Sequence, residues 1–426
     1  MDRRKIRNHA TRLKGDISLG PKLFMTTRAA VDPALFALDP ETIFLNHGSF
    51  GGCPVSVLKH QNELRLRLES QPVQFFQRDY EPLRDEALAV LGEFVGADKD
   101  DLVFVPNATE GVNTVVRSLP LRQGDEILVS NHEYNACRNA IEYAAEKRGA
   151  TVVVVDVPYP LASEDQVLEA IASKVSKKTR LALFDHVTSH TGLIMPIKRI
   201  IDYLAERGID TLVDGAHAPG MVPLSINALG AAYYTGNCHK WMCGPKSAAF
   251  LHVRRDKQSE VRPLTISHGA NSPRTDRSKF QIEFGWMGTR DPSSALTVPY
   301  AIEYMGGLLS GGWAAIMESN RRLALAGREV IQKTLGIAPP SPDSMIGSLA
   351  SIPLASPHLA EPSQSIKYQS NWQETLITRH NIEVPLFVWP SRPSHIVRIS
   401  AQVYNDLSQY EFLAERLKEL SAGGQG

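Results

Sequence analysis

The sequence lacks any long apolar run. None approaches the roughly 18 residues that a membrane-spanning helix needs, so we expect no span of a membrane. Neither sign of charge dominates, since Lys+Arg and Asp+Glu both number 46, and this balance gives no reason to expect nucleic acid or a membrane surface as a partner. Internal repeats and low-complexity tracts are absent too. What remains is an ordinary globular composition.

Cysteine is also scarce. The chain has four, namely Cys53, Cys137, Cys238 and Cys243, and no two of them form a zinc-type CxxC pair. Cys238 and Cys243 flank Lys240, but their spacing fits no metal signature. We therefore expect no metal site and take a reducing, cytoplasmic setting as the default.

The length of 426 residues, of which 43% are hydrophobic, is enough for two or three domains. Residues 1–28 are basic, which favours a loosely ordered tail; a targeting peptide is the alternative, but a secretory apolar region and cleavage site are missing. We expect an N-terminal segment over 1–40, a large domain over 41–308 and a small C-terminal domain over 309–426. Residues near 41–75 are candidates for packing on the small domain.

Apolar runs alternate with amphipathic stretches through most of the chain. The runs predict strands at 102–106, 126–130, 151–157, 180–184, 209–214 and 247–253. The stretches predict helices at 54–70, 79–94, 134–147, 164–175, 196–207 and 294–308. Such alternation predicts an α/β fold with a mostly parallel sheet flanked by helices. Residues 281–290, with their Gly-Thr step, predict a loop.

The C-terminal part has a different pattern. It predicts helices at 314–335, 371–379 and 406–420 and strands at 346–354, 384–389 and 395–400. Because strands and helices no longer alternate regularly, we expect a small α+β domain.

The segment from Val213 to Lys246 carries the main candidate site. An apolar run delivers Asp214 at its end, where a parallel sheet presents groups to a ligand. Lys240 follows between a histidine and Trp241, a poor setting for a solvated charge. An Asp and a Lys together suit pyridoxal phosphate, because the lysine forms a Schiff base and the carboxylate keeps the pyridine nitrogen protonated. In the alternative, Asp214 caps a helix and Lys240 extends along Trp241 to water.

Several polar residues share one property with Asp214: they fall at or just after the end of a predicted strand. They are Thr109, Tyr134, Ser189, His190 and His217. Residues 107–113 predict a strand-to-helix turn, whose free N–H groups, with the Thr109 hydroxyl, suit a phosphate. A well-capped helix is the plain alternative for this turn.

Two further segments suggest substrate contacts. Asn46 and His47 end a short apolar strand at a glycine-rich turn, although Asn46 and Ser49 could equally cap the helix that begins near Pro54. Arg398 lies between apolar residues of a predicted strand, where a charge needs a partner. A substrate carboxylate is one candidate and an inward salt bridge is the other.

Five motifs occur in order along the chain: Asn107-Ala-Thr-Glu-Gly111, Asp214-Gly-Ala-His217, His239-Lys240, Gly288-Thr289 and Arg398-Ile-Ser-Ala-Gln-Val-Tyr-Asn405. From about residue 40 to its end, the chain thereby resembles class V aminotransferase-fold enzymes, the fold-type I pyridoxal-phosphate group that includes cysteine desulfurases. The resemblance implies a large domain with a mostly parallel seven-stranded sheet and a small α+β domain.

A branch within that group is also indicated. Phe44-Leu-Asn-His-Gly-Ser-Phe-Gly51 and Phe75-Phe-Gln-Arg78 are similar to isopenicillin-N-epimerase-like enzymes and to hercynylcysteine sulfoxide lyases. This similarity implies an amino acid as the small-molecule substrate.

The resemblance implies roles around the cofactor ring. Lys240 carries the Schiff base and moves the α-proton, and Asp214 pairs with the pyridine nitrogen. His217 bonds the phenolic oxygen, and Tyr134 stacks on the ring.

It implies further contacts with the phosphate and the substrate. The expected phosphate contacts are Thr109, the backbone of Glu110, Asn237, His239 and Thr289. Thr289 would reach the phosphate of the neighbouring subunit, which implies a homodimer with shared active sites. Arg398 binds the substrate carboxylate, with Asn46 and His47 on the substrate side, and Ser189 or His190 stands where relatives place an Asn.

The implied chemistry begins at the α-carbon of an amino acid. Three reactions can follow, and the resemblance ranks them. Epimerisation comes first because of the branch that the chain resembles, C–S β-lysis of cysteine or a cysteine-conjugate S-oxide comes second, and transamination comes third. A cysteine desulfurase needs a late thiol to accept sulfur, and no cysteine follows Cys243. A binding protein without cofactor is the alternative from another class, and the complete set of Asp214, His217 and Lys240 argues against it.

Overall fold

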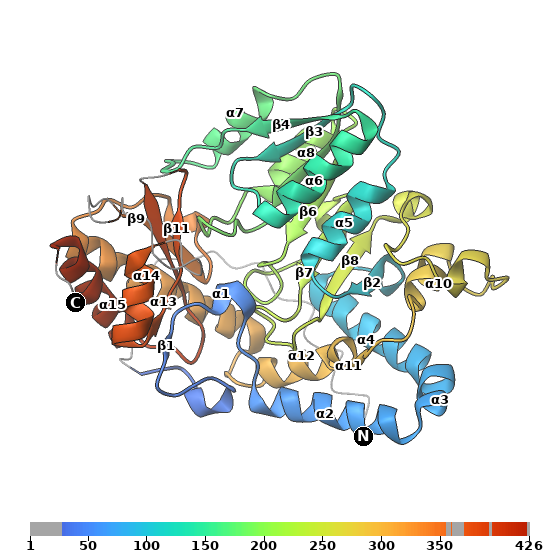
Figure 1. The fold of residues 1–426 in the computed structure, drawn as a ribbon, viewed down its shortest axis with the longest axis horizontal. Coiled ribbons are helices and arrows are strands. Elements are labelled where there is room, and N and C mark those ends of the chain that lie inside the picture. The colour runs from blue at the N-terminus through green and yellow to red at the C-terminus, as the bar shows by residue number, and fades with distance from the viewer. Residues whose placement is uncertain (1–27, 355–358, 360–369, 392–393, 424–426) are drawn as a thin grey trace.

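The structure is a computed structural model that describes residues 28–354, 359, 370–391 and 394–423 (Figure 1). The predicted basic tail falls almost wholly outside the described residues. Among the helices of the described part, none combines the length and the apolar character that crossing a membrane requires.

A seven-stranded sheet organises the larger part of the chain (Figure 1). In spatial order its strands are β2 (Leu102–Val105), β8 (Ala249–Val253), β7 (Tyr233–Asn237), β6 (Asp210–Gly215), β5 (Thr179–Asp185), β3 (Glu126–Ser130) and β4 (Thr151–Val155). Among them β8 alone runs antiparallel to its neighbours, so the other strands end at a common edge. The predicted mostly parallel sheet is confirmed.

One strand of this sheet was not predicted. β7 fills the position between β6 and β8. Its sequence ends in Gly236 and Asn237, which are poor strand formers, and its burial on both faces removes the alternation that marks a strand. Tyr233 packs into the cluster on one face and Tyr234 into the cluster on the other.

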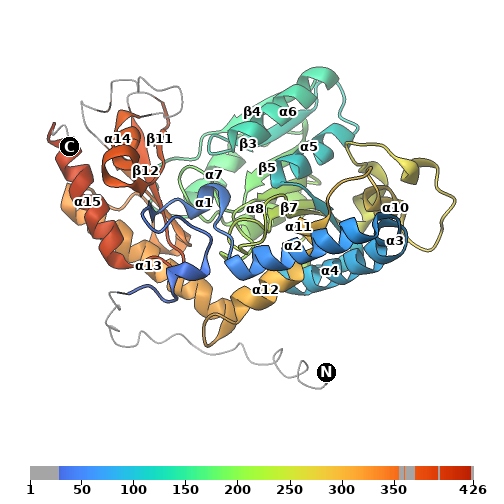
Figure 2. The same ribbon diagram turned by 60° about the horizontal axis from the view of Figure 1, so that its bottom comes forward.

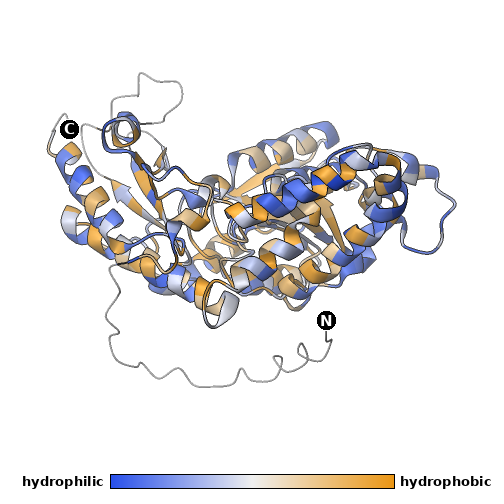
Figure 3. Cartoon of the chain, turned by 90° about the horizontal axis from the view of Figure 1, so that it is seen from below, coloured by the Kyte–Doolittle hydropathy of each residue, from blue (hydrophilic) through white to orange (hydrophobic). Residues whose placement is uncertain are grey.

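Both faces of the sheet are buried, so consecutive strand residues belong to different cores. Leu212 packs on the face covered by α5 (Ala108–Ser118) and α6 (Asn135–Arg148). Val213 packs on the opposite face. The helices of that second face are α4 (Tyr80–Val95), α7 (Asp165–Ala172), α8 (Ile197–Ala205) and α9 (Ile226–Leu229). Figure 3 shows the resulting two-toned helices, apolar on one side and hydrophilic on the other.

A second group of helices lies along the edge of the molecule in Figure 2. It comprises α2 (Val55–Ser70), α3 (Pro72–Gln74), α11 (Ser293–Leu296) and α12 (Val298–Gly306). The predicted loop over 281–290 is wrong in its first half, because α10 (Lys279–Gly285) covers it. The Ser278 hydroxyl caps this helix by accepting the Gln281 N–H. The buried rings of Phe280 and Phe284 lie one turn apart and pack against each other, which stabilises the helix.

The C-terminal elements build a second core. Its sheet has the order β11 (Leu386–Val388), β12 (His395–Ser400) and β9 (Leu349–Leu354), all antiparallel. Its helices are α13 (Gly312–Leu335), α14 (Asn371–His380) and α15 (Leu407–Ser421).

The chain's N-terminal strand joins this C-terminal part. β1 (Ile43–Phe44) pairs in parallel with β10 (Ile382–Glu383), and α1 (His47–Phe50) follows at once. Figure 1 shows these blue segments beside the red ones. The pairing places Asn46 and His47 between the two cores and agrees with the expectation that residues after 41 pack on the small domain. The exact domain boundaries stay a prediction.

Candidate active site

The predicted site residues gather at the edge where the parallel strands end. A cavity of about 300 Å³ opens there, and the described residues that line it include eight of the predicted ones: Thr109, Tyr134, Ser189, Asp214, His217, Asn237, His239 and Lys240. They lie at or after the ends of β2, β3, β5, β6 and β7, whose carboxyl ends share this edge. Topology therefore collects side chains that are far apart in the sequence.

Lys240 points into the cavity and not along Trp241 to water. Its Nζ lies 3.1 Å from Nε2 of His217. Burial, and next the charge of Arg398, lower the pKa of Lys240 to about 8. Burial also lowers the pKa of His217 well below its usual range, so the imidazole is neutral. The pair presents an amine that loses its proton near physiological pH.

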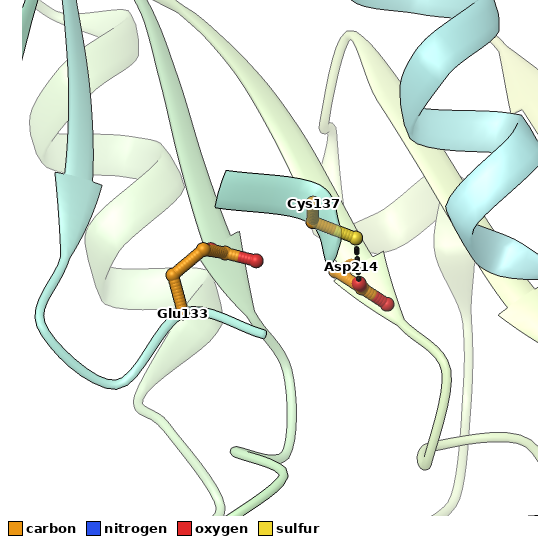
Figure 4. A group of neighbouring side chains, drawn as sticks. All are labelled: Glu133, Cys137 and Asp214. Carbon is orange, nitrogen blue, oxygen red and sulfur yellow. Dashed lines mark hydrogen bonds between the residues drawn. The ribbon is translucent and has the colours of Figure 1, made fainter. Parts of the chain in front are cut away.

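Asp214 is buried at the end of β6 and both its oxygens accept hydrogen bonds. Oδ1 accepts the Ala216 N–H at 2.8 Å, and Oδ2 accepts the Cys137 S–H at 3.2 Å (Figure 4). Burial raises the pKa of Asp214 despite these donors. Burial raises the pKa of this carboxyl group while its two hydrogen-bond donors lower it, and a group with these opposed effects is suited to share a proton with a ring nitrogen.

The same corner has the geometry of a possible cation site. Ligand atoms of Glu133, Cys137 and Asp214 lie within 4.8 Å of one another (Figure 4). Burial raises the pKa of the Cys137 thiol well above its usual range, so the sulfur keeps its proton and donates it to Asp214. A protonated thiol is a poor metal ligand. The chemistry of the group therefore favours an N–H donor over a cation.

Two acidic residues of the site were missed from the sequence. Asp185 ends β5 in register with Asp214, lines the cavity, and has one oxygen without a hydrogen-bond partner. Burial, and next the charge of Asp214, raise the pKa of Asp185 well above its usual range. Glu133 accepts the Tyr134 N–H, and its other oxygen is also buried without a partner. The place of Asp185 at a strand end was the available signal.

The start of α5 faces the cavity as an anion site. Asn107 accepts the Glu110 N–H at 2.8 Å, and Asn237 accepts the Ala108 N–H at 2.9 Å. The Glu110 backbone, a predicted phosphate contact, is thus already engaged, and Glu110 is not among the described residues that line the cavity. The Thr109 N–H has no hydrogen bond within the described residues, which leaves it available to a phosphate.

His239 and Ser247 also line this cavity. The His239 Nδ1–H donates to the Ala248 carbonyl at 2.9 Å, which leaves Nε2 for the cavity. Ser247, missed from the sequence, lines the cavity with a left-handed backbone (φ 69°). A serine in that conformation stores strain, a feature that clusters at functional sites.

Arg398 is buried without a carboxylate. Its guanidinium donates to the Ser189 carbonyl at 2.6 Å, to Asn46 at 3.3 Å and to Ser49 at 2.9 Å, and its Nε has no partner. No acidic side chain of the described residues lies within ion-pair distance, so the salt-bridge alternative is not observed. Burial lowers its pKa to about 10. Asn46 and Ser49 orient this charge and do not cap α2.

Besides Glu110, Asn46 and Arg398, three more predicted site residues are not among those that line the cavity. His47 is fully buried behind it, where Nε2 lies 3.1 Å from the Lys240 carbonyl oxygen, so we assign it a positioning role in place of a substrate contact. His190 stacks on Trp389 with ring centroids 5.7 Å apart, and the structure does not bring it to the cavity wall. Thr289 lines a separate hollow beside Arg65.

The cavity fits pyridoxal phosphate on observations that are independent of one another. The free N–H of Thr109 suits the phosphate, the doubly hydrogen-bonded Asp214 suits the ring nitrogen, and the amine of Lys240 suits the aldehyde. The sheet order with its common edge completes a fold-type I enzyme that uses this cofactor.

Comparison with known proteins identifies the family. Residues 69–411 match the family Aminotransferase class-V, so the chain belongs to this family of pyridoxal-phosphate enzymes, which act on amino acids. The chain is 34% identical over 399 residues to isopenicillin N epimerase from Amycolatopsis lactamdurans, covering 90% of this chain and 96% of that one. The predicted class V membership and cofactor are confirmed.

Other relatives catalyse carbon–sulfur cleavage by name. L-cysteine desulfhydrase from Arabidopsis thaliana is 30% identical (88% of this chain, 87% of the other), and hercynylcysteine sulfoxide lyase from Schizosaccharomyces pombe is 26% identical (90% and 95%). Among solved structures, the cystine C–S lyase C-DES superposes with a TM-score of 0.73 at 20% identity (89% and 98%), which supports the fold.

Proposed function

We propose that this enzyme epimerises the α-carbon of an amino-acid substrate. The observation that carries the proposal is the Lys240 amine, whose pKa is lowered to about 8, in one cavity with Asp214 and close to the unpaired charge of Arg398. The 34% identity to an isopenicillin N epimerase over nearly the whole of both chains supports epimerisation as the leading outcome.

Pyridoxal phosphate supplies an electron sink that acidifies the α-C–H bond of a bound amino acid. Arg398 binds the substrate carboxylate with N–H groups that have no acidic partner, and so orients the α-carbon. Nζ of Lys240, whose pKa is lowered to about 8 and which therefore loses its proton more readily than an ordinary lysine, would remove the α-proton. Asp214 would hold the ring nitrogen and help to keep it protonated.

Inversion requires a proton donor on the other face of the substrate. Tyr134 is our candidate, because it lines the cavity and burial raises the pKa of its phenol, which therefore stays protonated. His190 stacks on Trp389 and does not line the cavity, so it is our second choice for this donor.

The test is to incubate the holoenzyme with isopenicillin N and a panel of L-amino acids in deuterated water. We expect α-deuterium with inverted configuration in the wild type. Tyr134→Phe should keep exchange but lose inversion, Lys240→Ala should lose both, and Lys198→Ala, an exposed lysine on α8, should match the wild type. Exchange that never inverts configuration for any substrate contradicts the epimerase proposal.

A C–S β-lyase is the second candidate. It is supported by the desulfhydrase and sulfoxide lyase relatives. Incubation with cysteine, cystine and a cysteine S-oxide should then release pyruvate, and pyruvate without inversion would reverse our order of the two. A desulfurase stays disfavoured, since all four cysteines are buried and none follows Cys243.

We also propose a homodimer with shared sites. Thr289 and Arg290 line a hollow that is separate from the Lys240 cavity, and exposed apolar side chains on α2 and α3, Leu66 and Val73, lie on helices that border it. This placement suits Thr289 serving the phosphate of the partner subunit. Mixing inactive Lys240→Ala with a Thr289→Glu variant should restore activity, because one of the two sites in a mixed dimer is intact. No recovery after subunit exchange contradicts shared sites.

The cytoplasmic setting predicted from the cysteines remains a proposal. Fractionation of cells that express the tagged chain tests it, and recovery in an organelle or membrane fraction would contradict it.

A further inference from the structure

The neighbour of the reactive lysine, Trp241, donates a hydrogen bond to a histidine ring nitrogen. Its indole Nε1–H donates to Nδ1 of His217 at 3.4 Å. Trp241 is fully buried, and the described residues offer its N–H no other acceptor. An indole nitrogen only donates, so Nδ1 of His217 has to accept and carries no proton. Because His217 is neutral, its single proton is then on Nε2.

That tautomer determines what His217 offers to Lys240. Nε2 lies 3.1 Å from Nζ and presents an N–H to it. A neutral amine has a lone pair that accepts this hydrogen, whereas an ammonium group has only N–H bonds and cannot. The opposite tautomer would accept a hydrogen from the ammonium and stabilise it. The Trp241 bond therefore favours the form of Lys240 that attacks an aldehyde or removes a proton.

Trp241 is itself held in place from two sides. The ring of His47 packs against it with centroids 4.8 Å apart, and Nε2 of His47 lies 3.1 Å from the Lys240 carbonyl oxygen. Gly220 has a left-handed backbone (φ 83°) and lies so close that a Cβ would sit 2.6 Å from the Trp241 carbonyl. The indole therefore has little freedom to release His217.

We propose that Trp241 is a positioning residue, whose indole N–H selects the Nε2–H tautomer of His217 and so holds the Lys240 amine in its neutral, reactive form. The proposal rests on Lys240 being the reactive amine of the proposed function. The same Nε2–H suits an oxygen acceptor of the bound cofactor once Nζ is engaged. Trp241 touches none of the reacting atoms and acts through His217.

The variant Trp241→Phe removes the N–H and keeps a ring against His47. The matched control is Trp313→Phe, whose indole N–H donates to the Ile302 carbonyl at 3.0 Å away from the cavity. Long-range ¹H–¹⁵N spectra of the ¹⁵N-histidine-labelled full chain report the tautomer, with and without pyridoxal phosphate. A His217→Gln variant assigns the signal.

We expect the wild type and the Trp313 variant to show His217 protonated on Nε2, and Trp241→Phe to populate the Nδ1–H form. The pH midpoint for the reaction of the cofactor-free chain with pyridoxal phosphate should rise with it, so that reaction at pH 7 slows by about 3- to 10-fold. His217 protonated on Nδ1 in the wild type, or a tautomer unchanged in Trp241→Phe, overturns the proposal.

Two provisions keep the test decisive. Where Trp241→Phe fails to fold, benzothienylalanine, which replaces the indole N–H with sulfur at constant shape, is incorporated in place of tryptophan and should give the same shift. Where pyridoxal phosphate does not react with Lys240 at all, the proposed function fails. The tautomer in the cofactor-free chain then still decides whether Trp241 sets His217.

Discussion

Arg398 gives the most demanding prediction, because its charge is buried with hydrogen bonds but without a counter-ion among the residues that the structure describes. Its donors reach Ser189, Asn46 and Ser49, and Nε remains unused. A buried cation of this kind costs folding free energy until an anion arrives. Replacement by methionine keeps an unbranched apolar stem of similar length and removes the charge. The affinity for the amino acid should therefore fall, whereas the stability of the substrate-free protein should stay equal or rise.

The size of the binding effect follows from the lost contacts. A hydrogen bond between charged groups contributes about 1.5–3 kcal/mol, and a guanidinium can make two with one carboxylate. Arg398→Met should therefore weaken amino-acid binding by about 3 kcal/mol or more, which is roughly a hundredfold or greater. Arg398→Lys keeps a positive charge but cannot make two parallel hydrogen bonds with one carboxylate. Its affinity for the amino acid should therefore fall between those of the wild type and Arg398→Met. The melting temperature of the cofactor-loaded Arg398→Met protein should be equal or higher without substrate.

The assay is the amino-acid concentration that half-saturates the change in the cofactor's visible absorption. The control ligand is the corresponding amino-acid amide, which lacks the carboxylate and should bind wild type and Arg398→Met with equal affinity. An equal loss for acid and amide, or a loss below about threefold for the acid, refutes the assignment of Arg398 to the carboxylate.

Further predictions concern the lysine and its surroundings. Below its pKa of about 8, the amine of Lys240 is protonated, so the rate at which the cofactor-free chain takes up pyridoxal phosphate should rise about tenfold per pH unit and level off above pH 8; a midpoint near 10 contradicts burial as the cause. Gly51→Ala places a Cβ against the His239 carbonyl at a left-handed φ of 74°, so stability in urea should fall by about 1–3 kcal/mol and cofactor affinity should fall with it; an unchanged urea midpoint contradicts this. Cys137→Ala removes the S–H donor to Asp214 and should move the acid limb of the cofactor's absorption to higher pH, Cys137→Ser should restore it, and equal titrations of both variants would show that this bond has no effect.

The sequence predicted what local patterns encode. Asp214 and Lys240 could be recognised because an apolar run ends at one and a polar, aromatic turn holds the other, and the structure brings both to one cavity. β7 could not, since its sequence, Tyr-Tyr-Thr-Gly-Asn, shows neither the alternation of a half-exposed strand nor the apolar run of the other buried strands. The regular order of strands and helices was sufficient for the parallel sheet.

Electrostatic partners depend on tertiary structure and were the harder part. The sequence did not show that Asn107 would occupy the Glu110 N–H, nor that Asp185 would lie in register with Asp214. The sequence likewise left Arg398 open between a salt bridge and a ligand, and only the structure showed that no acidic side chain of the described residues pairs with it.

The covalent bond between Lys240 and the cofactor is the claim on which the account depends, and it can be measured directly. The holoenzyme is reduced with borohydride and digested, and the peptides are analysed by mass spectrometry. We predict a pyridoxyl-phosphate adduct on the peptide that contains Lys240, and no adduct in Lys240→Ala. An adduct confined to another lysine, or none on a protein that retains the cofactor, would contradict the account.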